Sequence, residues 1–230
     1  MKEIKYQSWP LGKLKAYQLR KEPYLIKNKG YAWKDPWDIV NIFEKKVARF
    51  SGCKYAVAVD CCSHGIFLTL KFLNAKNIIT IPKRTYVSVP MQIRHAGCKI
   101  RFKEIKWEGA YRLDPFPIWD FAGRWTEGMF NGEFNILSFQ LKKRIPIGRG
   151  GMILTNNKKA YKWLKKASYD CRDLNIDYIK NKYPFLGWHY YMTPEDAARG
   201  ILLMDKTKKK NEDTFSYVNY GDLSKFKIFK

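Results

Sequence analysis

The chain has 230 residues, 46% of them hydrophobic and 16% aromatic, which is enough apolar sequence for one folded core and excludes a disordered polymer. Its formal net charge of +23 fits either a solvated lysine-rich surface or an anionic partner, such as a nucleic acid, a membrane surface or a phosphorylated small molecule. No apolar run reaches the ~18 residues that a membrane-spanning helix needs, and the 5 cysteines lack the C-x-x-C spacing of a zinc site.

Short apolar stretches alternate with amphipathic ones from Pro36 onward, whereas residues 1–35 show no clean period. The predicted helices cover residues 36–51, about 63–73, 86–96, 158–170 and 193–205. The predicted strands cover residues 55–59, 78–81, 98–102, 117–120, 134–139 and 151–155. This order predicts an α/β fold with a largely parallel central sheet flanked by helices.

Two of the predicted helices carry clear end signals. The helix that begins at Pro36 meets a stop at Gly52. Thr193 is expected to cap the last helix, with Pro194 as its first residue. The KTKKK cluster at 206–210 follows that helix and opens a basic tail.

The residues that follow each predicted strand are the candidates for function, because ligands of α/β sheets bind at the carboxyl ends of the strands. Strand 55–59 is followed by DCCS (60–63), and strand 78–81 by PKRTY (82–86). Strand 117–120 ends on Asp120. The strand at 134–139 is followed by the cations Lys142, Lys143 and Arg144.

These strand ends together offer the four parts of a pyridoxal phosphate site. A lysine forms the Schiff base, a carboxylate pairs with the pyridinium nitrogen, an aromatic ring stacks on the cofactor, and N–H groups at a helix start hold the phosphate. Taken singly, Ser63 is explained as a helix cap, Tyr86 as a core ring, Asp120 as a turn cap, and the lysines as solvated charges. The combination favours the cofactor site.

Other catalytic signatures are missing from the sequence. It has no GxxxxGK[ST] phosphate loop and no GxSxG nucleophile elbow. His64, His95 and His189 lack metal-ligand spacing, so no metal site is expected. A nucleophilic Cys61 or Cys62 at the helix start would have no evident partner base.

Five segments resemble, in the same order, segments of the DegT/DnrJ/EryC1/StrS aminotransferases, pyridoxal-phosphate enzymes that aminate keto sugars carried on nucleotides. The segments are FEKKVARFSGCKYAVAVDCCSHGIFLTLKFL (43–73), IPKRTYVSVPMQIRHAGCKIRF (81–102), PIWDFAG (117–123), SFQLKKRIPIGRGGMILTN (138–156) and GWHYYMTPEDAARG (187–200). The resemblance spans about 35–205. It implies the fold-type I large domain of that family, a three-layer αβα arrangement.

The resemblance assigns roles to residues of the sheet edge. Lys143, five positions after Ser138, matches the Schiff-base lysine. Ser138 matches a serine whose hydroxyl contacts the cofactor phosphate. Asp120 matches the aspartate at the pyridine nitrogen, and Tyr86 falls where an aromatic ring stacks on the cofactor.

Three further residues match positions around the phosphate. Cys62 and Ser63 fall where the family has a Gly–Thr pair that cradles the phosphate. His189 falls where an Asn commonly reaches the phosphate of the neighbouring subunit's cofactor. This last match implies a homodimer with shared active sites.

The sequence also departs from the family pattern. Gly123 replaces a Gln or His near the cofactor, so that contact is expected to be lost or taken over by Arg124. Arg149 replaces a common Glu, and Cys62 replaces a Gly. The family continues into a small C-terminal domain that is expected to be truncated here. The expected organisation is an N-terminal segment (1–34), a cofactor-binding large domain (35–205) and a short basic C-terminal tail (206–230).

The resemblance implies amino transfer from an amino acid, glutamate in the family, to a nucleotide-diphosphate keto sugar, through an internal aldimine of pyridoxal 5'-phosphate on Lys143. The family's role is amino sugar biosynthesis. One alternative is a pyridoxal-phosphate sugar dehydratase, but such relatives carry His in place of the lysine. The other is a non-catalytic basic binding protein on the same scaffold. Nucleic acid and membrane partners are not expected, and the N-terminus without an apolar signal core predicts a cytoplasmic location.

Overall fold

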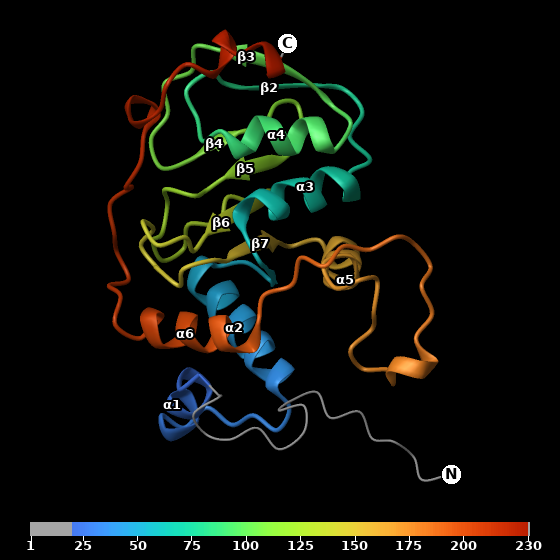
Figure 1. The fold of residues 1–230 in the computed structure, drawn as a ribbon. Coiled ribbons are helices and arrows are strands. Elements are labelled where there is room, and N and C mark those ends of the chain that lie inside the picture. The colour runs from blue at the N-terminus through green and yellow to red at the C-terminus, as the bar shows by residue number, and fades with distance from the viewer. Residues whose placement is uncertain (1–19, 230) are drawn as a thin grey trace.

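A central sheet lies between two layers of helices in the computed structural model of the chain, which describes residues 20–229 (Figure 1). The helices are α1 (Glu22–Asn28), α2 (Pro36–Ser51), α3 (Cys62–Phe72), α4 (Ser88–His95), α5 (Lys158–Ala167) and α6 (Pro194–Met204). The strands are β1 (Tyr55–Val59), β2 (Ile78–Pro82), β3 (Lys99–Lys103), β4 (Tyr111–Arg112), β5 (Ile118–Asp120), β6 (Phe134–Ser138) and β7 (Gly151–Thr155). The predicted order of elements is confirmed, and α1 and β4 are additions to it.

Most strands run in the same direction, although few of the neighbouring strands that pair by hydrogen bonds are parallel to each other. Five strands form a sheet in the order β1-β7-β6-β5-β4, and β2 and β3 form a parallel pair. β5 pairs parallel with β6, whereas β7 runs antiparallel to both β1 and β6, and β4 antiparallel to β5. An antiparallel bridge between Thr80 and Asp114 joins β2 to the segment after β4.

It follows that β1, β2, β3, β5 and β6 point the same way, and that β4 and β7 run against them. The predicted α/β class is confirmed. The expectation of a largely parallel sheet is right for strand direction and wrong for the pairing of neighbours. The reason is that β7 is inserted between β1 and β6 and so replaces a parallel contact with two antiparallel ones.

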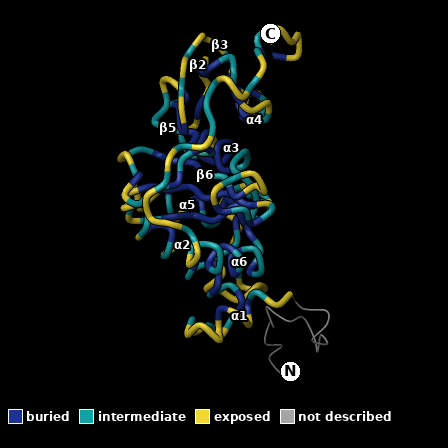
Figure 2. The backbone as a smooth tube through the Cα atoms, turned by 90° about the vertical axis from the view of Figure 1, so that its left-hand side faces the viewer, coloured by how far each residue is buried: buried dark blue, intermediate teal, exposed yellow. Residues whose placement is uncertain are grey.

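The strands bury side chains on both faces of the sheet. Because successive side chains point to opposite faces, Ala56 and Ala58 of β1 pack in one apolar cluster with α2 and α6. Val57 and Val59 pack in a second cluster with α3, α4 and α5. The buried strands are the dark core of the tube in Figure 2. Burial on both faces explains their continuous apolar sequences and gives the predicted three-layer αβα arrangement.

Local signals set the ends of the predicted helices. Asp35 caps α2 through its side chain, and Gly52 ends that helix in the left-handed conformation at φ 84°. Thr193 caps α6 by accepting a hydrogen bond from the N–H of Asp196, as its sequence predicts.

The segments before α2 and after α6 both pack onto the sandwich. Arg199 of α6 pairs with Glu22 of α1 at 3.8 Å, and Lys29 pairs with Asp205 at 3.5 Å. Residues 206–229 return along the edge of the molecule toward β2 and β3, where Leu223 and Phe229 are buried (Figure 1). The residues after α6 are therefore a packed part of the fold and not a free tail. None of the helices within 20–229 is long and apolar enough to cross a membrane.

Candidate active site

The ends of several strands meet around one cavity of about 440 Å³. β1, β2, β5 and β6 point toward this edge of the sheet, so the residues that follow them converge. All of the site residues predicted from the sequence except His189 line the cavity: Cys62, Ser63, Tyr86, Asp120, Ser138 and Lys143. Their individual roles stay predictions, but the structure places them at one site.

Asp120 ends β5 and is only 4% exposed. Its Oδ2 accepts a hydrogen bond from the Tyr111 hydroxyl at 2.8 Å, and its Oδ1 accepts one from the N–H of Ala122 at 2.8 Å. The Cys62 Sγ lies 3.9 Å from Oδ1. Burial raises the pKa of Asp120, and these hydrogen bonds and the charge of Lys143 offset part of that effect. The hydrogen-bond partners of this carboxyl within residues 20–229 are thus neutral.

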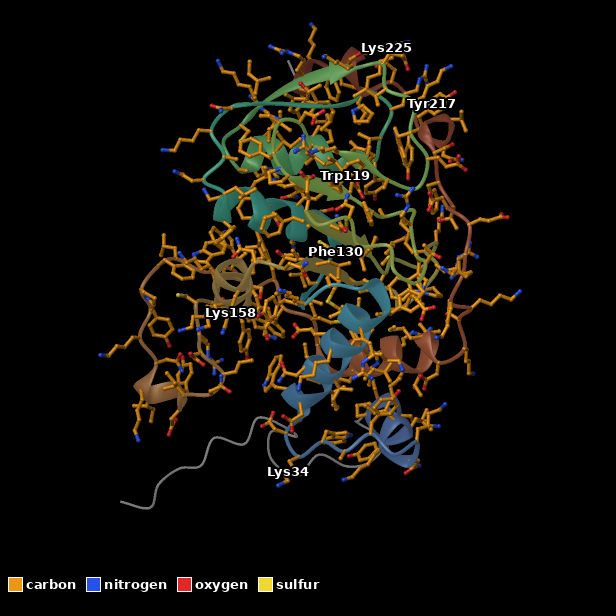
Figure 3. The ribbon with its side chains drawn as sticks, turned by 180° about the vertical axis from the view of Figure 1, so that it is seen from behind. Lys34, Trp119, Phe130, Lys158, Tyr217 and Lys225 are labelled. Carbon is orange, nitrogen blue, oxygen red and sulfur yellow. The ribbon has the colours of Figure 1, made fainter. Side chains whose placement is uncertain are left out.

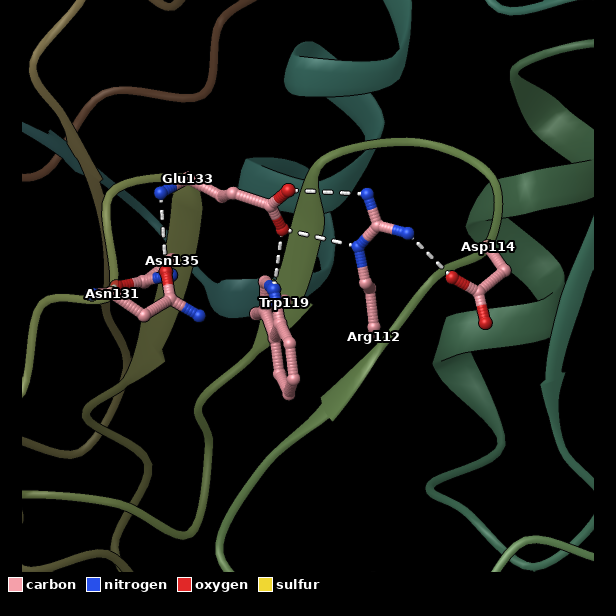
Figure 4. A network of polar contacts seen from close by, with 6 residues as sticks. All are labelled: Arg112, Asp114, Trp119, Asn131, Glu133 and Asn135. Carbon is pink, nitrogen blue, oxygen red and sulfur yellow. Dashed lines mark hydrogen bonds and ion pairs between the residues drawn. The ribbon is translucent and has the colours of Figure 1, made fainter.

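A polar network fixes the strand that carries Asp120 (Figure 4). Trp119, the preceding residue, donates its Nε1–H to Glu133 at 2.6 Å. Arg112 of β4 donates to both oxygens of Glu133 at 3.1 Å, and to Asp114 at 2.7 Å. Partly exposed pairs of this kind contribute about 1 kcal/mol or less. Their main effect is therefore to hold β4 against β5, so that Tyr111 and Asp120 face each other.

Lys143 follows β6 in a turn in which its N–H donates to the carbonyl of Gln140 at 2.8 Å. Its Nζ lies 3.8 Å from the centroid of the Phe215 ring. Burial lowers the pKa of Lys143 below the ordinary value of 10.5, although its electrostatic interactions with Asp120 and Cys62 act in the opposite direction. A larger fraction of the amine is therefore neutral at a given pH, as a nucleophile or a base requires.

The first turn of α3 opens on the cavity. Cys61 caps the helix, since its Sγ accepts a hydrogen bond from the N–H of His64 at 3.4 Å. The cap is therefore not Ser63, whose Oγ lies 2.6 Å from the Ser88 Oγ instead. The N–H groups and the dipole of such a helix start favour an anion. Burial raises the pKa of the Cys62 thiol well above its ordinary range, which disfavours Cys62 as a nucleophile.

The rim of the cavity carries exposed polar and charged groups. Arg149, with a side chain 69% exposed, donates to Asp60 at 2.6 Å, and the second oxygen of Asp60 lies 2.7 Å from His64 Nδ1. Burial alone would lower the pKa of His64, but its hydrogen bonds to Asp60 and Cys61 and their charges raise it to about 9. The carboxylate of Asp60 is therefore shared between two cations. Lys142 adds a further exposed cation to the cavity lining.

Two residues singled out in the sequence do not line the cavity. His189 has its Nδ1 2.6 Å from an Asp170 oxygen and a side chain 67% exposed. Arg124 donates to both carboxylate oxygens of Asp213 at 2.6 to 3.2 Å. Arg124 therefore does not take over the contact expected at Gly123, although Gly123 itself lines the cavity.

Several residues of the cavity are not evident in the sequence. Tyr111 belongs to a strand of 2 residues, too short for a periodic pattern, and its hydroxyl bonds to both Thr85 and Asp120. Phe215 and Tyr220 line the cavity from the segment after α6. Nothing in the local sequence of that segment signals a contact with Lys143, because the contact depends on the path of the chain in three dimensions.

Comparison with known proteins confirms the family resemblance. Residues 28–118 match the DegT/DnrJ/EryC1/StrS aminotransferase family. The spore coat polysaccharide biosynthesis protein SpsC of Bacillus subtilis (strain 168) is 35% identical over 89 residues, which cover 37% of this chain and 22% of SpsC.

Solved structures share the fold. The sugar aminotransferase CalS13 from Micromonospora echinospora is similar with a TM-score of 0.67 and 15% identity, over 81% of this chain and 64% of that one. DesI, solved in the presence of its TDP-sugar product, is similar with a TM-score of 0.61 and 17% identity, over 80% of this chain and 57% of that one. The chain spans less than two thirds of each of these proteins. The fold is the fold-type I arrangement of pyridoxal-phosphate aminotransferases, as the resemblance implies.

Proposed function

We propose that the protein is a pyridoxal-phosphate-dependent aminotransferase that transfers an amino group from an amino acid, with glutamate as the expected donor, to a keto sugar linked to a nucleotide diphosphate. One observation carries this proposal. A half-buried lysine amine and a buried carboxyl that forms no salt bridge within residues 20–229 line the same cavity. The family match and the sugar aminotransferases of similar fold support it.

The residues of the cavity fit the cofactor. Asp120 is a buried carboxyl that forms no salt bridge among residues 20–229, and the protonated ring nitrogen would supply one. The first turn of α3, with Ser63 and Ser138 nearby, would hold the phosphate. Tyr86 would cover one face of the ring, and Lys143 would bind its aldehyde carbon.

Lys143 performs the proton transfers in this account. When bound, pyridoxal phosphate supplies an electron sink that stabilises negative charge at the carbon bearing the amino group. The Lys143 amine takes the proton from the α-carbon of the donor, and it later delivers a proton to the carbon that receives nitrogen. Its lowered pKa keeps part of the amine neutral for the first step. Asp120 keeps the ring nitrogen protonated, and Tyr111 and the N–H of Ala122 hold Asp120 in place.

The rim of the cavity supports an anionic substrate. Arg149 and Lys142 are exposed cations of its lining, and the only acid in the lining, within residues 20–229, is the buried Asp120. Arg149 keeps its guanidinium exposed while it is held by Asp60. A diphosphate at the rim would make charge-assisted hydrogen bonds with these side chains. The net charge of +23 would also attract such a substrate over longer distances.

We also propose a homodimer. The segment between α5 and α6 projects from the sandwich (Figure 1) and exposes large apolar side chains: Leu174, Ile176, Tyr178, Ile179, Tyr183 and Leu186. Exposed apolar groups gathered in one segment are typical of an interface. His189 lies near the end of this segment and outside its own cavity, as a residue that serves the partner's site would. Sedimentation equilibrium should give twice the mass of one chain, and a mass of 27.2 kDa would contradict the dimer.

The two half-reactions of amino transfer can be tested one after the other. The protein loaded with pyridoxal phosphate should convert glutamate to 2-oxoglutarate in an amount equal to the cofactor. Addition of a nucleotide-diphosphate keto sugar should then make the reaction catalytic. Protein without the cofactor is the control. Failure to release a keto acid from any common amino acid would contradict the aminotransferase, and loss of water from the sugar instead would indicate the dehydratase.

A further inference from the structure

Part of the chain after α6 lines the cavity. We refer to residues 209–223 as the C-terminal strap. Figure 3 shows the segment that carries Tyr217 running along the edge of the molecule between α6 and the end near Lys225. Two aromatic residues of the strap, Phe215 and Tyr220, line the cavity.

Backbone hydrogen bonds attach the strap to the sheet edge along its whole length. The N–H of Glu127 donates to Lys209, and that of Thr214 to Gly123. Further along the strap, the N–H of Gly109 donates to the carbonyl of Phe215. The N–H of Tyr217 donates to the carbonyl of Trp107, and that of Leu223 to the carbonyl of Lys83. Regular attachment of this kind indicates a defined position and not an incidental contact.

An ion pair anchors the strap beside the cavity. Arg124 donates to both oxygens of Asp213, with a shortest distance of 2.6 Å. The Asp213 side chain is 19% exposed, so this is a partly buried, bidentate pair. Arg124 therefore binds the strap through Asp213.

Two glycines make room for the strap. At Gly109, a Cβ would lie 2.0 Å from the Asp213 carboxylate, and its φ of +66° also favours glycine. At Gly123, a Cβ would meet the backbone of Gly109 at 3.0 Å and the Phe215 Cβ at 3.3 Å. The glycine that departs from the family pattern at 123 is therefore explained by close packing against Gly109 and the strap.

The strap brings an aromatic ring against the reactive amine. The Phe215 ring lies over Lys143 with Nζ 3.8 Å from its centroid, close enough for a cation–π contact when the amine is protonated. Tyr220 stacks on Trp107 at 5.7 Å, which extends the aromatic wall. The ring of Phe215 removes water from one side of the amine.

We propose that the C-terminal strap is a fixed wall of the active site and that Phe215 is a positioning residue for the Lys143 amine. The proposal rests on the proposed function in that the amine it positions is the reactive one. Phe215 restricts the rotamers of Lys143 and directs Nζ back into the cavity, where Asp120 lies. It also excludes water, so the amine is less exposed than its neighbour Lys142.

The test uses the full chain without cofactor. Lysines are acetylated with a trace of acetic anhydride across a series of pH values, and the rate at each lysine is read by mass spectrometry. The plateau of each profile reports access to the amine, and its midpoint reports the pKa. The other charged or titratable groups that line the cavity are common to all variants: Cys61, Cys62, Tyr86, Tyr111, Asp120, Lys142, Arg149 and Tyr220.

In Phe215→Ala, the plateau rate of Lys143 should rise toward that of Lys142, and its midpoint should move up toward 10.5 because water returns to the amine. Phe215→Leu should restore much of the protection. Val218→Ala, at a strap residue 69% exposed, is the matched control and should leave the profile unchanged. Gly109→Ala should expose Lys143 by displacing the strap while Phe215 is intact.

Identical Lys143 profiles in the wild type, Phe215→Ala and Gly109→Ala would overturn the proposal. Since the labelling needs neither cofactor nor substrate, this result is independent of whether the protein transfers amino groups. In the loaded protein, Phe215→Ala should lower kcat more than it raises KM. A change in KM alone would show that Phe215 only contacts substrate.

Discussion

Replacing Lys143 with alanine is expected to lower the rate of amino transfer by on the order of 10⁴-fold, the upper range of what a positioned acid or base contributes. The half-reaction that forms 2-oxoglutarate from glutamate is the appropriate measurement, because it is independent of the identity of the sugar. The loss should persist at saturating glutamate, since the missing amine acts in proton transfer and not in donor binding.

Lys142→Ala is the matched control for this prediction. Lys142 is the neighbouring lysine and also lines the cavity, but its side chain is exposed, whereas that of Lys143 is half-buried beneath Phe215. We expect Lys142→Ala to keep the half-reaction and to weaken only the binding of the nucleotide-diphosphate sugar. Equal loss in the two variants would contradict the choice of Lys143 as the reactive lysine.

Asp120→Asn is expected to lower kcat about 10²-fold, as is typical for loss of one group that stabilises developing charge. The variant keeps the size of the side chain and an oxygen that can accept from the N–H of Ala122. It cannot keep a ring nitrogen protonated, so the electron sink is weakened while the lysine remains available. Full activity in Asp120→Asn would refute this role.

The same variant should change the pH dependence of stability in the cofactor-free protein. Burial raises the pKa of Asp120 in the folded state above 3.8, so folding favours the protonated carboxyl. The free energy of unfolding of the wild type should therefore fall as the pH rises from about 3.8 through the folded-state pKa. Asp120→Asn should lack this decrease, which thermal unfolding at a series of pH values would measure.

Much of the site follows from strand ends that are visible in the sequence. The apolar stretches that become β1, β5 and β6 end shortly before Cys62, at Asp120 and at Ser138, respectively. Because these strands share one direction, their ends meet at one edge of the sheet. Lys143 could be chosen over Lys142 only through the family resemblance, since residue type and charge do not distinguish the two.

The remainder of the site depends on contacts that no local pattern encodes. β4 has 2 residues, yet it supplies Tyr111, the hydrogen-bond donor to Asp120. The antiparallel insertion of β7 between β1 and β6 is a property of the whole topology. The contact between the strap and Lys143 could not be predicted from the sequence either. Phe215 is far from Lys143 in the sequence, and the sequence after α6 predicts only a basic tail. Its position depends on Gly109, Gly123 and the Arg124–Asp213 pair.

The central claim, that Lys143 is the amine that binds pyridoxal phosphate, is tested most directly by reduction of the loaded protein with borohydride. One cofactor should become permanently attached per chain, and peptide mapping should place it on Lys143. The attachment should be lost in Lys143→Ala and kept in Lys142→Ala. A stable adduct on Lys142 or another lysine, or no adduct at all in the wild type, would contradict the account.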